Sequence, residues 1–142
     1  MSNNELKRQF SSLMHELIII NRGIFKRGDY SNLTALCDQD ITILDIMGDT
    51  EYITAREISN RLKVPKSTIV TAVARLVKRG YIKREQNQED RRKMLLKLTD
   101  LGIKANDEHQ EYENIILETL VNMWNEEDQK KLSQLFKRRK EI

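Results

Sequence analysis

Side chains that can contact phosphates and base edges share one face of a helix expected over residues 66–79. Small hydroxyl groups let a helix approach base edges closely, and arginine or lysine can reach guanine acceptors or phosphates. The first turn of such a helix also offers unbonded N–H groups to a phosphate. The plain alternative is a solvated polar face on an ordinary core helix. We predict DNA contacts from Lys66, Ser67, Thr68, Thr71 and Arg75, and from Thr54 at the start of the preceding helix.

A second cationic segment lies between two short extended stretches expected over 81–85 and 94–98. Arginine suits the narrow minor groove, where the potential is most negative. A neighbouring carboxylate can hold one guanidinium in a fixed orientation. The alternative is a solvated loop whose charges only keep edge strands apart. Because the segment follows a helix pair directly, we interpret it as a wing and predict DNA contacts from Asp90, Arg91, Arg92 and Lys93.

Charge is distributed unevenly along the chain, although the net charge of the 142 residues is only +3. Residues 54–98 hold 13 lysines and arginines against 4 acidic residues, a net charge of +9. The remaining residues hold 12 against 18, a net charge of −6. A basic module inside an acidic frame is typical of phosphate binding.

Local signals predict two consecutive helices in the basic module. Thr54 and Glu57 form a capping box that opens the first helix. Pro65 interrupts the chain and is tolerated in the first turn of the second helix, where its missing N–H has no helical partner to lose. Gly80 ends the second helix in a left-handed conformation. A short helix, a three-residue break and a longer helix predict a helix-turn-helix.

Further helices are expected on both sides of this module. Apolar residues recur at helical spacing over 4–27 and again over 99–123, and Asn125 can cap a last helix. Another helix, capped by Asp38, is expected to end at Gly48. The apolar stripes of the outer helices are either ordinary core faces or a seam against a second chain.

Two runs carry a resemblance to a known family. They are ITAREISNRLKVPKSTIVTAVARLVKRGYIKR and EDRRKMLLKLTDLG, within Ile53 to Gly102. Both resemble the winged helix-turn-helix of the MarR family of bacterial transcription regulators, and the Asp-Arg-Arg wing followed by Leu-Thr-x-x-Gly is the specific part. The flanking helices match the family in order and length. Pro65 departs from the pattern, because a capping serine is common there, and this leaves open which of Lys66, Ser67 and Thr68 meets a base.

The resemblance implies a homodimer on a pseudo-palindromic operator in double-stranded DNA. The helix over 66–79 would enter the major groove, and Arg92, oriented by Asp90, would enter the minor groove. Recognition helices related by a dimer axis lie about 34–36 Å apart. The first and last helices of two subunits would interleave. The dimer contacts expected on this basis are Leu6, Phe10, Leu13, Leu17, Leu120, Trp124, Leu132, Leu135 and Phe136.

We therefore predict a mainly α fold with a minor α+β element: a winged helix-turn-helix whose flanking helices form a dimerisation domain. Residues 1–36 and 100–142 are the predicted dimerisation region, and 37–99 the predicted DNA-binding lobe. The predicted function is sequence-specific DNA binding by an effector-responsive repressor. The alternative is a winged-helix module that binds protein without reading DNA sequence. The +9 segment favours DNA.

Other functional classes have little support in the sequence. The sequence contains no Gly-rich phosphate loop, no metal-ligand spacing and no nucleophile with a nearby base. It therefore gives no indication of an enzyme, and we predict no catalytic residue, cofactor or metal. No apolar run is long enough for a membrane span, and the single Cys37 is consistent with a reducing cytoplasm. We expect Cys37 to be a small buried apolar residue rather than an oxidant sensor. A small-molecule effector of unknown identity is expected from the family.

Overall fold

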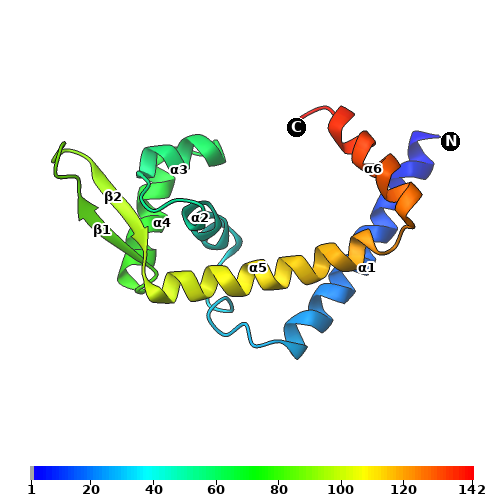
Figure 1. Cartoon of the computed structure of the whole chain (residues 1–142), viewed down its shortest axis with the longest axis horizontal. Helices are drawn as coiled ribbons and strands as arrows, with labels where there is room; N and C mark the ends of the chain where they lie inside the picture. The colour runs from blue at the N-terminus through cyan, green and yellow to red at the C-terminus, as the bar shows by residue number, and fades with distance from the viewer. Residues whose placement is uncertain (1) are drawn as a thin grey trace. The chain divides into compact units, whose positions relative to one another are not determined.

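The structure is a computed structural model that describes residues 2–142. Over these residues the chain is mainly helical, with one two-stranded antiparallel sheet (Figure 1), as predicted. The helices are α1 (Asn3–Arg27), α2 (Asp38–Gly48), α3 (Ala55–Leu62), α4 (Lys66–Lys78), α5 (Asp100–Val121) and α6 (Glu126–Arg138). The strands are β1 (Ile82–Gln86) and β2 (Met94–Leu98).

Two compact units divide the chain. The first, which we call the lobe, is Asp29–Gln110. The second, which we call the helical frame, comprises the residues up to Gly28 and Glu111–Ile142. The lobe takes in more of the chain than the predicted 37–99. Its extra residues include Tyr30, Leu33 and Ala105, which are buried.

The lobe has a complete apolar core. α3 packs on α4, α4 packs on β1, and α2 packs on β2. The strands pair in register from Ile82 opposite Leu98 to Gln86 opposite Met94, and Ile53 adds a single bridge to Leu96. Figure 1 shows the hairpin extending from these helices, with its turn at the far end. The largest fully buried apolar side chains are Ile43, Leu44, Met47, Ile53, Ile58, Ile69, Leu76 and Ile82.

Most of the predicted helix ends in the lobe are present. The Thr54 hydroxyl accepts a hydrogen bond from the Glu57 N–H at 3.2 Å, and α3 begins at Ala55. Gly80 has a φ of +88°, and the N–H of Tyr81 bonds to the Leu76 carbonyl at 2.9 Å. This is the bond pattern of a glycine-terminated helix.

The predicted cap of α2 is wrong by one residue. Cys37, not Asp38, is the N-cap, and Asp38 is the first helical residue. The carboxylate of Asp40 accepts the Cys37 N–H at 3.4 Å, so the acid that serves this helix end comes from inside the helix. Cys37 is also exposed rather than buried, because it lies at the start of the helix and outside the core.

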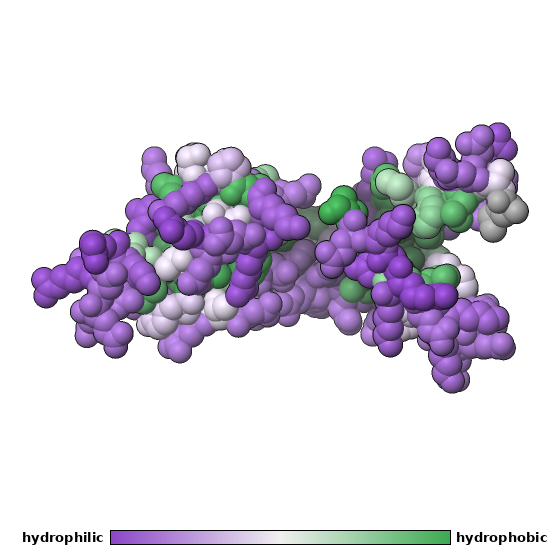
Figure 2. Space-filling view, turned by 90° about the horizontal axis from the view of Figure 1, so that it is seen from above, coloured by the Kyte–Doolittle hydropathy of each residue, from purple (hydrophilic) through white to green (hydrophobic). Residues whose placement is uncertain are grey.

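The helical frame has almost no core of its own. Ile24 is the only apolar side chain buried in the described part of the frame. Large apolar side chains remain exposed, among them Phe10 at 59% and Phe136 at 60%. Figure 2 shows apolar side chains grouped at the surface of the frame, whereas the hairpin of the lobe is hydrophilic. None of the helices described in residues 2–142 is both long and apolar enough to cross a membrane.

Gly102 is predicted to contribute to the stability of the fold, because α5 begins directly against the chain leaving α4. A Cβ at this position would lie 2.2 Å from the Tyr81 carbonyl oxygen. We expect Gly102→Ala to lower the free energy of unfolding by about 1–3 kcal/mol, the usual cost of overpacking. In Gly23→Ala the new Cβ would lie 3.7 Å from the nearest atom outside its own helix backbone, so it serves as the control. We expect this control to be stabilising by about 0.5–1 kcal/mol. Urea denaturation measures both, and equal stability of Gly102→Ala and the unsubstituted protein would contradict the close approach.

Candidate nucleic-acid interface

The start of α4 presents its polar side chains on the face opposite its core face. Ile69, Val73 and Leu76 are buried in the lobe, whereas Lys66 and Ser67 are exposed. Thr68 is half-buried, and Thr71 and Arg75 are exposed one and two turns further along. The predicted contact residues of α4 therefore lie on one accessible surface.

A shallow hollow lies on this surface. It has a volume of about 350 Å³ and is lined by Gln39, Ser67, Thr68, Thr71, Ala72 and Arg75. The Thr71 hydroxyl donates to the Ser67 carbonyl at 3.0 Å, which leaves its oxygen lone pairs directed away from that bond. The hollow thus offers hydroxyl, amide and guanidinium groups, which can pair with base edges or phosphate oxygens.

The N-terminal end of α4 has no side-chain cap. Pro65 is the N-cap residue rather than part of the first turn as predicted, since its φ of −57° and ψ of 142° are not helical and the helix begins at Lys66. The first bond of the helix joins the Thr68 N–H to the Pro65 carbonyl at 3.0 Å. The first turn also contains no acidic residue. Its N–H groups and the positive end of the helix dipole are therefore available to an anion.

Thr54 has a different role from the α4 residues. Its side chain is half-buried and its hydroxyl caps α3. The Thr54 hydroxyl oxygen therefore stabilises the start of α3. Its O–H and its second lone pair are the groups that could still contact DNA.

The turn of the hairpin is ordered by its own polar groups. Asp90 Oδ1 accepts the Arg92 N–H at 3.1 Å and the Arg92 Nε–H at 3.4 Å. Asn87 Oδ1 accepts the Glu89 N–H at 2.9 Å, and the Lys93 N–H bonds to the Asp90 carbonyl at 3.0 Å. The expected pairing of Asp90 with an arginine is therefore present.

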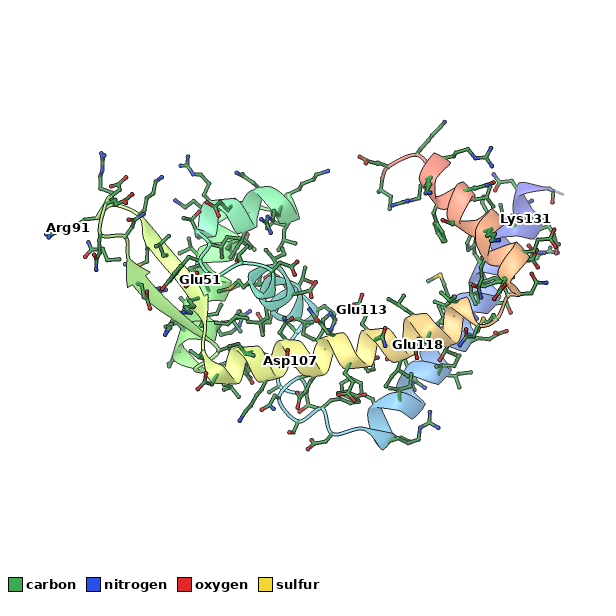
Figure 3. All side chains as sticks on the ribbon, in the orientation of Figure 1. Glu51, Arg91, Asp107, Glu113, Glu118 and Lys131 are labelled. Carbon is green, nitrogen blue, oxygen red and sulfur yellow. The ribbon has the colours of Figure 1, made fainter. Side chains whose placement is uncertain are left out.

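The arginines at this turn are open to solvent. The Arg92 side chain is 93% exposed although Asp90 orients it. Figure 3 shows Arg91 at the tip of the hairpin, pointing away from the helices of the lobe. An oriented but solvated guanidinium loses little side-chain entropy when it enters a groove. The geometry therefore matches the predicted wing.

Arg75 has a partner that the sequence reasoning missed. Its Nη2 donates to Oδ1 of Asp40, which comes from α2 and is buried at 2% exposure. This hydrogen bond, and secondarily the charge attraction, raises the pKa of Arg75 above its ordinary value. A signal was available: Asp40 lies on the same stripe of α2 as the buried Ile43, Leu44 and Met47. A carboxylate on an apolar stripe requires a partner inside the fold.

Other groups that could carry chemistry stay apart. In the part of the chain that the structure describes, no three His, Cys, Asp or Glu side chains lie close enough to hold a metal ion. Both oxygens of Glu108 accept from Asn32, at 3.1 Å from the backbone N–H and 3.0 Å from Nδ2. This carboxylate anchors the loop before α2 to the first half of α5.

Comparisons with known proteins agree with this arrangement. The family model described as "MarR family" matches residues 32–93, which include α2, α3, α4, β1 and the turn of the hairpin. No curated protein sequence matches the chain. Solved structures share the fold at low sequence identity.

One is Streptococcus pneumoniae FabT in complex with DNA, with 22% identity, a TM-score of 0.77 and coverage of 96% of each chain. A second is the YusO protein of Bacillus subtilis, with 19% identity, a TM-score of 0.68 and coverage of 96% of this chain and 95% of that one. A third is the reduced form of MarR from E. coli, with 20% identity, a TM-score of 0.66 and coverage of 89% and 93%. Residues 32–93 therefore match the MarR family model, and the chain shares the fold of these solved structures.

Proposed function

We propose that this protein is a repressor that binds a pseudo-palindromic DNA operator as a homodimer. The observation that carries the proposal is the pair of accessible cationic surfaces on one lobe, the start of α4 and the Asp90-oriented Arg92 of the wing. The structurally similar FabT was solved in complex with DNA, which supports the same partner for this chain. The net charge of +9 over residues 54–98 favours DNA over a protein ligand.

The two surfaces suit two different grooves. The first turns of α4 carry small hydroxyl residues and an uncapped helix end, which fit the edges of bases and a phosphate in the major groove. The wing is narrow and ends in arginines, which fit the minor groove. In this proposal Lys66, Ser67, Thr68, Thr71 and Arg75 act in the major groove, Thr54 lies near the backbone, and Asp90, Arg91, Arg92 and Lys93 act at the minor groove.

The helical frame supports a homodimer. α1, the second half of α5 and α6 bury only Ile24 among their apolar side chains, so these amphipathic helices leave apolar surface uncovered. Such surface marks an interface. The proposed contacts are Leu6, Phe10, Leu13, Leu17, Leu120, Trp124, Leu132, Leu135 and Phe136, of which Leu6, Phe10, Leu135 and Phe136 are the most exposed.

Repression follows from occupancy of the operator, and a small-molecule effector that favours another arrangement of the dimer would release it. We assign the protein to the cytoplasm, where the DNA of a bacterium lies. An effector acts only through its differential affinity for the bound and released states.

Selection of bound fragments from genomic DNA would give the operator and its neighbouring genes. Equal recovery of all fragments would support a protein-binding winged helix instead.

The wing is predicted to contribute directly to operator affinity. We expect Arg92→Ala to weaken operator binding by about tenfold or more, equivalent to ~1.4 kcal/mol, because it removes an oriented cation from the minor groove. Lys83→Ala removes the same charge from β1, on the stem of the same hairpin, and is the matched control. We expect a change of no more than about threefold there. Fluorescence anisotropy with labelled operator measures both variants, and equal losses would reduce the wing to a general source of charge.

The frame is predicted to hold the dimer together. Phe136→Asp replaces an apolar side chain of α6, which is 60% exposed in the single chain, with a carboxylate. We expect the variant protein to sediment as a monomer rather than as a dimer, because the carboxylate would be buried in the interface. Operator affinity should fall with it, because one lobe alone reads only half of the site. Gln134→Asp adds the same charge on an exposed polar position of α6 and should remain dimeric. A Phe136→Asp protein that stays dimeric at micromolar concentration would contradict the assignment.

A further inference from the structure

Asp40 is an unusual residue in the lobe. Among residues 2–142 it is the only charged residue that is fully buried, at 2% exposure. Its two oxygens have separate partners, because Oδ2 accepts the Cys37 N–H at 3.4 Å and Oδ1 accepts from Arg75 Nη2. The first contact holds the carboxylate to the start of α2, and the second joins it to α4. The carboxylate is therefore fixed in position.

This fixed carboxylate restrains a partly exposed arginine. The Arg75 side chain is 44% exposed although its guanidinium is tied to a buried group. A guanidinium has five N–H donors in a planar arrangement, and Asp40 occupies one of them. Arg75 Nη2 is thus held from inside the fold, and the 44% exposure of the side chain leaves part of the guanidinium accessible.

The accessible side of Arg75 borders the hollow on α4. Gln39, the residue before Asp40, lines the same hollow together with Ser67 and Thr71. α2 therefore contributes to this surface twice, with Gln39 at the wall and Asp40 beneath Arg75. A planar donor pair beside a hollow of about 350 Å³ is suited to the O6 and N7 acceptors at the edge of a guanine.

We propose that Asp40 is a positioning residue for base recognition: it orients Arg75 to read one guanine in each half-site of the operator. The inference rests on the proposed DNA binding and deepens it. Arg75 is restrained before DNA arrives, so little side-chain entropy is lost on contact. A purely structural pair would hold α2 to α4 and would have no effect on base preference.

Selection of bound DNA from a randomised operator library tests the proposal. We expect Asp40→Asn to reduce the preference for guanine at one position in each half-site by about tenfold, since it removes the charge that orients Arg75. The other positions should keep their preferences, and affinity for random DNA should not fall, because the substitution removes a negative charge. Asp38→Asn is the matched control, since it removes the same charge from an exposed position in the same turn of α2. The control should reproduce the unsubstituted preferences throughout.

Arg75→Lys provides a second test that does not depend on the folding of Asp40→Asn. Lysine keeps a cation beside Asp40 but lacks the planar donor pair, so the same guanine preference should be lost. Loss at the same position in both variants would support the proposal. Preferences unchanged at every position, at a temperature where both variants are folded, would overturn it and leave the pair as a structural link. Failure of the unsubstituted protein to prefer any sequence would instead contradict the proposed function.

Discussion

The burial of one face of α4 is the constraint on which the interface depends. Ile69 and Leu76 are at 0% exposure and Val73 is at 2%, so α4 cannot rotate about its axis without exposing its core face. Burying side chains of this size stabilises a fold by about 1.5–3 kcal/mol each. The orientation of the polar face follows from this burial, because residues at the remaining helical positions must point outward. The packing of the core therefore determines which side chains of α4 are available for the proposed DNA contacts.

The hairpin also depends on the core of the lobe, through its packing on α4 and α2. Gly80 ends α4 in the left-handed region, and Tyr81 directs the chain into β1, which packs on α4. β2 packs on α2 and returns the chain to α5. Two strands of this length are marginal alone, so the helices supply their stability. The wing tip can then be polar throughout, since its order comes from Asn87 and Asp90 rather than from apolar burial.

The sequence predicted those features whose causes are local. Thr54, Pro65 and Gly80 act within a few residues of themselves, and the helix ends that they predict are present. The position of Asp40 on the apolar stripe of α2 indicates that it needs a partner, but Arg75 lies 35 positions away, so no local pattern identifies that partner. The unit boundary inside α5 was also unpredictable, because the apolar periodicity runs through both halves of the helix without interruption. β1 begins at Ile82 rather than at the predicted Tyr81, because the Tyr81 N–H bonds to the Leu76 carbonyl at the end of α4.

The lobe and the frame use apolar surface in opposite ways. The lobe buries most of its large apolar side chains within itself, whereas the described part of the frame buries only Ile24. In the proposed dimer, the frame holds two lobes at one spacing, which converts general attraction to phosphate into recognition of a two-fold site. Hydroxyl-radical footprinting on the selected operator tests this directly. We expect two symmetric protected half-sites with centres about 10–10.5 base pairs apart, or a multiple of that. A single asymmetric protected stretch, or uniform protection along the DNA, would contradict it.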